Sequence, residues 1–153
     1  MIDTENKDAW CEYGANLETQ FITRKFNDVE VKINGLKSSD KYTYDLRIEL
    51  PADLKSIKTK WIFSQDMFGI PPERAISINE KDFIRYAKHY PNILIILDVE
   101  WDGVYSITVD RARHLIREKK AKKHVYEKRK DDIKGNAKCS YIFDLNDLDK
   151  LQD

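Results

Sequence analysis

The chain has 153 residues, of which 41% are hydrophobic and 11% aromatic, enough to form one ordinary core and too many for a largely disordered chain. Lys and Arg together number 27, as do Asp and Glu, so the net charge is zero although 35% of the residues are charged. No apolar run approaches the roughly 20 residues that span a bilayer, and the acidic, polar N-terminus is not a signal peptide. The two cysteines are far apart, which disfavours a disulfide framework or a structural zinc site. We therefore expect a soluble, cytoplasmic chain that forms one domain, 1–153.

Hydrophobic patterns along the chain predict a mixture of helices and strands. Asn34-Gly35 and Pro51-Ala52 predict turns between strands, and Asn79 and Pro91 mark the start and the end of a helix. The aliphatic run that begins at Ile93 predicts a strand buried on both faces, as in the centre of a parallel pair. In chain order, the patterns predict a helix at 7–26, strands at 29–33, 42–50 and 54–63, a loop at 64–73, a strand at 75–78, a helix at 79–90, strands at 93–99 and 105–109, a long helix at 110–130, a strand at 140–143 and a closing helix capped by Asp144.

The segment from Tyr44 to Lys55 carries the side chains best suited to chemistry. Asp45 stands at the head of one predicted strand, and Asp53 and Lys55 stand at the head of the next. Because Asp53 and Lys55 are two residues apart in a strand, they point to the same face. Two carboxylates without an obvious arginine partner repel each other unless a divalent cation joins them, and Mg2+ prefers such oxygen ligands. A neighbouring lysine can then orient a metal-bound water, or help to deprotonate it, for attack on phosphorus.

Asp45, Asp53 and Lys55 resemble the signature of the PD-(D/E)xK nuclease superfamily. The order helix, three strands, helix, strand resembles the restriction-endonuclease-like core of that superfamily (αβββαβ). The resemblance implies Mg2+-dependent hydrolysis of DNA phosphodiester bonds, with Mn2+ able to replace Mg2+. It implies that Asp45 and Asp53 bind the metal and that Lys55 aligns the attacking water. Glu18 is the best match to the further acidic, catalytic residue that the superfamily often carries on its first helix.

The resemblance covers about residues 10–99, within an expected core at about 7–100, and leaves an extension at about 104–153. The implied fold class is α/β, with a mixed central sheet flanked by helices and a C-terminal basic helical extension. The implied protein is an endonuclease that acts on double-stranded DNA, either of the homing type found in phages and mobile elements or selective for DNA junctions. Cutting both strands requires two active sites or sequential nicking, so a homodimer is expected. No Gly-rich phosphate loop is present, and no nucleotide cofactor is expected.

Two other interpretations of the motif stay open. If Pro51-Ala52 forms a two-residue hairpin turn, Asp45 lies across from about Lys58. Ser56 and Lys58 then take the place of the second aspartate and the lysine, and the affinity for a metal falls. We favour the first arrangement because it supplies the carboxylate. Alternatively, the aspartates are ordinary polar residues of strand ends and turns, the lysines face solvent on an edge strand, and the helix glutamate is solvated.

From Arg111 to Lys138 the chain carries twelve Lys or Arg residues and only four acidic ones. Such a segment can neutralise a row of phosphates and release counterions, which gives a DNA affinity that falls steeply with salt. A solvated, salt-bridged helix is the ordinary explanation for clustered lysines, but the motif upstream favours DNA. The rival functions are a DNA-binding protein that keeps the fold without catalysis and a protein-interaction domain whose charges serve solubility. The residues expected to bind DNA are Arg111, Arg113, Arg117, Lys120, Lys123 and Arg129.

Overall fold

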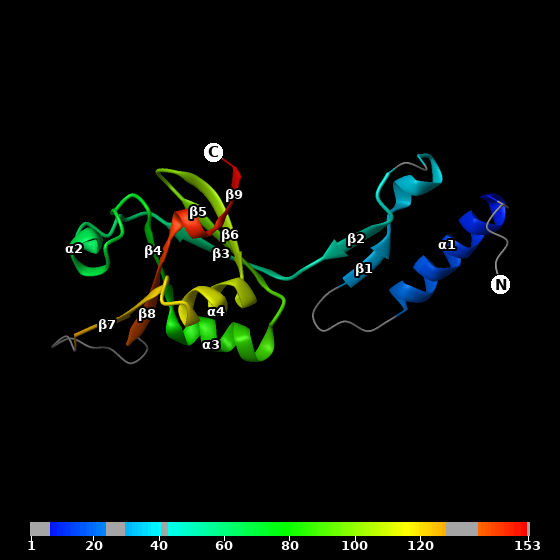
Figure 1. The fold of residues 1–153 in the computed structure, drawn as a ribbon. Coiled ribbons are helices and arrows are strands. Elements are labelled where there is room, and N and C mark those ends of the chain that lie inside the picture. The colour runs from blue at the N-terminus through cyan, green and yellow to red at the C-terminus, as the bar shows by residue number, and fades with distance from the viewer. Residues whose placement is uncertain (1–6, 24–29, 41–42, 128–137, 153) are drawn as a thin grey trace. The chain divides into compact units, whose positions relative to one another are not determined.

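The computed structural model describes residues 7–23, 30–40, 43–127 and 138–152 (Figure 1). The chain divides into two compact units, Met1–Leu50 and Pro51–Asp153, and each is described by itself. Helices and strands occur in both units, which confirms the α/β class. In the described ranges, no helix has the length and the apolar composition needed to cross a membrane. The expectation that 1–153 forms one domain stays a prediction.

The first unit combines a helix with a two-stranded antiparallel sheet. The register places Val31 opposite Ile48 and Ile33 opposite Leu46. These apolar side chains therefore share one face of the sheet, and charged side chains occupy the other face. Asn34 is buried, and its side chain accepts a hydrogen bond from the Leu36 N–H at 3.2 Å to cap a short 3-10 helix. The elements of this unit are α1 (Lys7–Ile22), β1 (Glu30–Ile33), η1 (Gly35–Ser38) and β2 (Leu46–Glu49).

The second unit contains a mixed four-stranded sheet in the order β3-β5-β6-β9. Strands β3 and β5 are parallel, and the remaining pairs are antiparallel. The aliphatic run forms β5, which confirms a central strand with a parallel neighbour. Its two faces differ, however, because Ile95 and Leu97 are buried while Asp98 is exposed, so only one face lies in the core. The strands are β3 (Ala52–Ile57), β5 (Leu94–Val99), β6 (Gly103–Thr108) and β9 (Asp149–Gln152).

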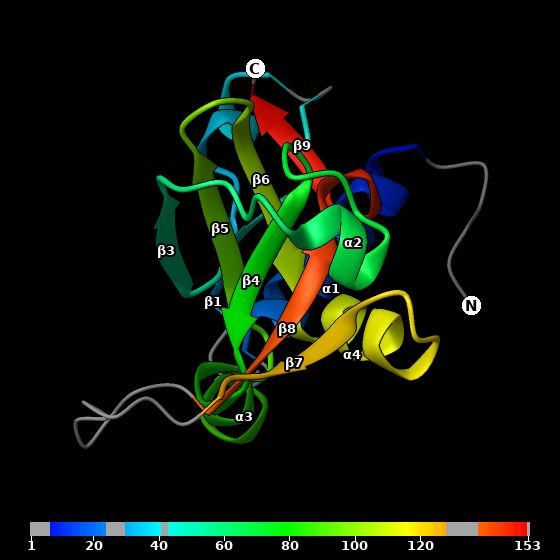
Figure 2. The same cartoon turned by 90° about the vertical axis from the view of Figure 1, so that its left-hand side faces the viewer.

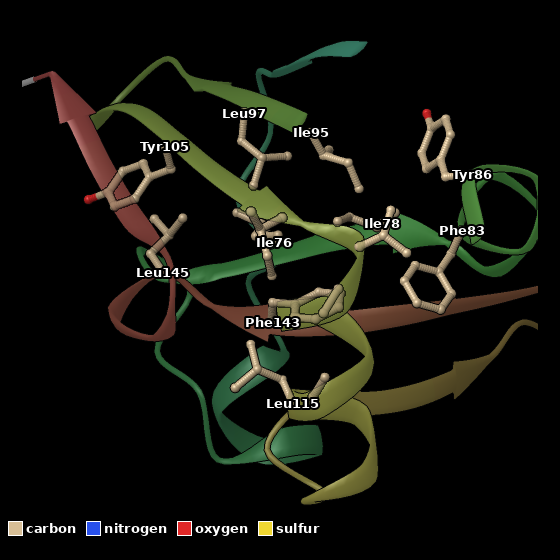
Figure 3. Packing of buried hydrophobic residues seen from close by; sticks show 14 of the residues in the cluster. Ile76, Ile78, Phe83, Tyr86, Ile95, Leu97, Tyr105, Leu115, Phe143 and Leu145 are labelled. Atoms are coloured by element: carbon tan, nitrogen blue, oxygen red, sulfur yellow. The ribbon is translucent and has the colours of Figure 1, made fainter. Parts of the chain in front are cut away.

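A second, antiparallel sheet in this unit has the order β4-β8-β7, and Figure 2 shows these strands side by side. Side chains from both sheets meet those of two helices in one core (Figure 3). The residues at its centre include Ile76, Ile78, Phe83, Tyr86, Ile95, Leu97, Leu115 and Phe143. The elements that complete the unit are β4 (Ala75–Asn79), β7 (Lys122–Val125), β8 (Cys139–Asp144), α2 (Ser64–Phe68), α3 (Glu80–His89), α4 (Val109–Arg117) and η2 (Leu145–Asp147).

The long basic helix predicted at 110–130 is wrong. Helix α4 ends at Arg117, and Lys119 adopts a left-handed conformation with φ 59°. The N–H groups of Lys120 and Ala121 both donate to the Leu115 carbonyl, at 3.0 and 3.1 Å, which closes the helix end. The apolar stripe of the helix does not continue beyond this point. The chain instead enters β7, whose backbone pairs with β8.

Three further expectations differ from the structure. The predicted loop at 64–73 begins with α2, which ends at Gly69 in a left-handed conformation with φ 73°. The first three predicted strands correspond to β1, β2 and β3, of which β1 pairs with β2 and β3 pairs with β5. Ala52 begins β3 opposite Leu94, and the Pro51 carbonyl accepts from the Leu94 N–H at 2.9 Å, so Pro51-Ala52 is not a two-residue hairpin turn. The closing helix is the short 3-10 helix η2, although Asp144 caps it as expected, accepting from the Asn146 N–H at 3.0 Å.

Candidate functional site

Strand β3 carries the aspartate and the lysine of the motif. Its residues alternate between half-buried and exposed, and Asp53 and Lys55 lie on the half-buried side. The Lys55 Nζ lies 3.2 Å from the Asp53 Oδ2, which confirms that the two side chains share a face. Ser56 lies on the exposed side and Lys58 follows the end of the strand, so neither takes their place.

Helix α3 places three more side chains, those of Asp82, Arg85 and Tyr86, around Asp53 and Lys55. The Asp82 Oδ2 lies 3.0 Å from the Lys55 Nζ, and the Asp82 Oδ1 lies 3.1 Å from Arg85 Nη2. The Tyr86 hydroxyl donates a hydrogen bond to the Asp53 Oδ2. We call Asp53, Lys55, Asp82 and Arg85 the charged quartet. Its two acids and two bases sum to no net charge.

The helix holds these groups in place because its apolar residues are anchored in the core. Asp82 and Tyr86 are four residues apart and therefore lie on one face of α3. The Tyr86 ring is buried, and Figure 3 shows its hydroxyl directed away from Ile78 and Phe83. Lys55 Nζ lies 5.7 Å, and Arg85 Cζ 5.2 Å, from the centre of this ring. The ring thus fixes the hydroxyl that meets β3 and lies beside both cations.

The network also sets the protonation states of its members. The hydrogen bond from Tyr86 holds the pKa of Asp53 below its usual 3.8, although burial opposes this shift, so the carboxylate is ionised at neutral pH. Burial lowers the pKa of Lys55, but interactions with Tyr86, Asp82 and Asp53 outweigh burial and raise it above the usual 10.5. Burial, and then the bond to Asp53, raises the pKa of Tyr86. Lys55 is therefore protonated at neutral pH.

The lowered pKa of Asp53 predicts an acid-sensitive contribution to stability. A carboxyl whose folded pKa lies below its unfolded pKa stabilises the fold above the unfolded pKa, and this stability is lost as the pH falls through the folded value. Wild type is therefore expected to lose more stability than Asp53→Asn as the pH drops below about 4. Urea unfolding at a series of pH values measures this difference. Asp98→Asn, which removes an exposed carboxylate of β5, is the control, and parallel curves for wild type and Asp53→Asn would contradict the prediction.

The carboxylates of the second unit do not by themselves make a magnesium site. Each Asp82 oxygen lies beside a cation, and the Asp53 Oδ2 is shared by Tyr86 and Lys55. Across the described residues, no three His, Cys, Asp or Glu side chains gather closely enough to hold a metal ion. The sequence predicts carboxylates without a neutralising partner, whereas the structure places two cations, Lys55 and Arg85, beside them. The residues described in this unit therefore do not fit the metal on their own.

The other acidic residues of the motif belong to the first unit. Asp45 is exposed just before β2, and its carbonyl accepts a hydrogen bond from the Asn34 N–H at 3.0 Å. Glu18 is half-buried on α1. Because the two units are described separately, a metal shared by Asp45 and Asp53 stays a prediction.

The cations predicted to bind DNA are spread over several elements instead of one long helix. Three arginines lie on α4, Lys120 lies in the turn after it, and Lys123 lies on β7. Several of these cations have acidic neighbours: Arg113 lies 3.7 Å from Asp110, Lys120 3.9 Å from Asp147, and Lys123 2.7 Å from Glu80. The α4 arginines are Arg111, Arg113 and Arg117, all of them exposed, and Arg129 lies outside the described residues.

Comparisons with known proteins add little to this picture. The sequence matches no protein-family model and no curated protein. Among solved structures, the chain is similar to a nuclease from a fusselovirus, with a TM-score of 0.44 and 15% identity over 95% of this chain and 88% of that chain.

Proposed function

We propose that the protein is a nuclease that hydrolyses phosphodiester bonds in DNA, with Asp53 and Lys55 in its active site. The observation that carries the proposal is their pairing on β3, where an ionised carboxylate lies 3.2 Å from a lysine that keeps its proton. The Lys55 side chain is 23% exposed and that of Asp53 37% exposed, so both can be reached from solvent. This pairing is the one expected from the PD-(D/E)xK motif.

The roles differ between the two residues. Phosphoryl transfer builds negative charge on the oxygens around phosphorus, and a fixed cation stabilises that charge. Lys55 is such a cation, and helix α3 and β3 hold it in place through Asp82 and Asp53. Because it stays protonated, it acts by attracting the phosphate and not by accepting a proton from water. Asp53 holds the lysine and presents a carboxylate beside it.

Mg2+, replaceable by Mn2+, is proposed as the cofactor on the strength of the sequence motif alone. A bound divalent ion supplies an activated water and charge compensation at phosphorus. Asp45 and Asp53 are the proposed metal ligands, and Glu18 is the proposed further catalytic acid, as the motif implies. No step above depends on the ion, since Asp53 and Asp82 are each compensated by a neighbouring cation.

A second candidate is a DNA-binding protein that has the fold without catalysis. The neutrality of the charged quartet favours it, because ion pairs of this kind also occur in sites that serve structure alone. Its binding would rest on the exposed arginines of α4 and on the lysines that follow, and would weaken steeply with salt. Duplex DNA that stays whole under every divalent metal, yet is retained at low salt, would support this candidate.

The experiment that tests the proposal is cleavage of supercoiled plasmid, a four-way junction and single-stranded DNA, each with Mg2+, Mn2+ or a chelator. Wild type is expected to cleave at least one of these with a divalent metal present. Asp53→Asn is expected to cleave about 100-fold more slowly or worse, because the carboxylate beside the lysine is lost. Asp98→Asn removes a carboxylate from the exposed face of the same sheet and should cleave like wild type. Equal rates for wild type and Asp53→Asn would exclude the proposed site.

The same substrates distinguish a junction-selective nuclease from a homing-type endonuclease. Preference for the four-way junction supports a junction nuclease, whereas cutting at one plasmid position supports a homing-type enzyme. The proposed homodimer predicts twice the chain mass of 18.1 kDa in light scattering after size exclusion. A mass of one chain together with nicking of one strand would support a monomer that cuts strands in sequence.

A further inference from the structure

Two cations of the charged quartet share one carboxylate. The Lys55 Nζ lies 3.0 Å from the Asp82 Oδ2, and the Arg85 Nη2 lies 3.1 Å from the Asp82 Oδ1. One residue from a strand and one from a helix therefore contact the two oxygens of a single acidic group. The two non-bridging oxygens of a phosphate can contact a lysine and an arginine in the same way as the two oxygens of this carboxylate do.

The exposure of these side chains differs in a way that matters for a ligand. The Arg85 side chain is 55% exposed, whereas those of Lys55 and Asp82 are 23% and 22% exposed. Both cations lie beside the buried Tyr86 ring, which limits where they can move. An anion that approaches from solvent meets Arg85 first and then competes with Asp82 for Lys55.

We propose that Lys55 and Arg85 form a binding site for one DNA phosphate, and that Asp82 occupies this site as an internal counter-ion until the phosphate displaces it. The inference rests on DNA being the substrate, as proposed above. It assigns a substrate contact to Arg85, which lies outside the PD-(D/E)xK motif, and makes Asp82 a competitor of the substrate. A carboxylate with a purely structural role would not compete with DNA.

The inference predicts opposite effects for the two α3 residues. Asp82→Asn removes the carboxylate that contacts Arg85 and one of the two that contact Lys55, and it is expected to tighten DNA binding about threefold to fivefold, the range that one exposed ion pair covers. Arg85→Gln removes one phosphate contact and is expected to weaken binding by a similar factor and to reduce the salt slope by about one. The double variant, with both Asp82→Asn and Arg85→Gln, is expected to bind DNA less tightly than Asp82→Asn alone, because the proposed phosphate site then has one cation fewer.

The test is fluorescence anisotropy of full-length protein with a short labelled DNA duplex, in a chelator and at several salt concentrations. Lys88→Gln, which removes an exposed cation from the last turn of the same helix, is the control for Arg85→Gln. Asp66→Asn, which removes an exposed carboxylate from α2, is the control for Asp82→Asn. Screening over about 10 Å at 0.1 M salt keeps the effect of a distant charge small. Urea midpoints confirm that each variant is folded.

Two results would overturn the inference. One is an equal loss of affinity in Arg85→Gln and Lys88→Gln, and this comparison stands even if Asp82→Asn is unstable. The other is a folded Asp82→Asn that binds DNA no more tightly than Asp66→Asn. Because binding is measured without the divalent metal that the proposed cleavage requires, the outcome is separate from the nuclease proposal. If the variants bind DNA as expected but the wild type does not cleave it, the phosphate site is supported in a non-catalytic protein. If cleavage depends on Asp53 while Arg85→Gln changes neither binding nor cleavage, the nuclease proposal is supported and the phosphate site is excluded.

Discussion

Lys55→Met is expected to slow DNA cleavage about 100-fold to 1000-fold, the usual cost of removing one fixed group that stabilises charge in the transition state. Methionine keeps the unbranched stem that β3 places beside Tyr86, so the packing changes little while the ammonium is lost. The measurement is the single-turnover rate at saturating DNA, which separates chemistry from binding. Lys58→Met removes an exposed lysine beyond the end of β3 and is the control. Equal cleavage rates for Lys55→Met and Lys58→Met would show that Lys55 does not belong to the active site.

Lys55→Arg distinguishes the two roles that a lysine can have in such a site. Arginine is always charged in proteins and cannot accept a proton. Because the pKa of Lys55 lies above its usual 10.5, the lysine is already a fixed cation, and arginine is expected to retain part of the activity. An arginine variant as inactive as the methionine variant, with DNA binding intact, would favour a proton-accepting lysine instead.

A fragment of residues 51–153 is expected to fold alone, whereas a fragment of residues 1–50 is not. The buried hydrophobic residues of the described chain all lie in the second unit, where two sheets and two helices share a core. In the described part of the first unit, Asn34 is the buried residue, and Leu36, Tyr44 and Ile48 are each about 60% exposed. A lone helix and a two-stranded sheet are both marginal in water without such burial.

Circular dichroism and urea unfolding of the two fragments check this expectation. The longer fragment should unfold in one cooperative transition, and the shorter should show no transition and little helix. The full chain is the reference for both. A cooperative transition in the fragment 1–50 would contradict the prediction and would show that the first unit stabilises itself.

The elements that the sequence predicted correctly are those whose local pattern agrees with their tertiary surroundings. The aliphatic run at 93–99 became β5 because five consecutive aliphatic residues fit the centre of a sheet. The helix between Asn79 and Pro91 became α3, although the Asn79 side chain does not cap it and instead accepts a hydrogen bond from the Ser140 hydroxyl. The basic helix was predicted too long because nothing local marks Lys119, a non-glycine residue, as the left-handed end of α4.

Only the part of the candidate site that depends on local spacing was predicted from the sequence. Spacing within one strand was enough to place Asp53 beside Lys55. Asp82, Arg85 and Tyr86 were missed because they meet β3 only through the packing of α3, far along the chain. The signal that pointed to them was an acidic residue and a buried tyrosine four residues apart on an amphipathic helix, but this pattern alone does not identify a partner.

The parallel pairing of β3 with β5 has a consequence for how the protein reaches its native state. The hairpin of β5 and β6 closes over a short turn, whereas β3 reaches β5 only after α2, β4 and α3 have been threaded between them. Closing that larger loop costs more entropy and slows the step. As an outer strand with one neighbour among the described strands, β3 is expected to detach in native-state fluctuations more readily than β5 or β6, which pair on both edges. Because the proposed active site lies on β3, the proposed activity is expected to be lost when β3 detaches, before the hydrophobic core opens.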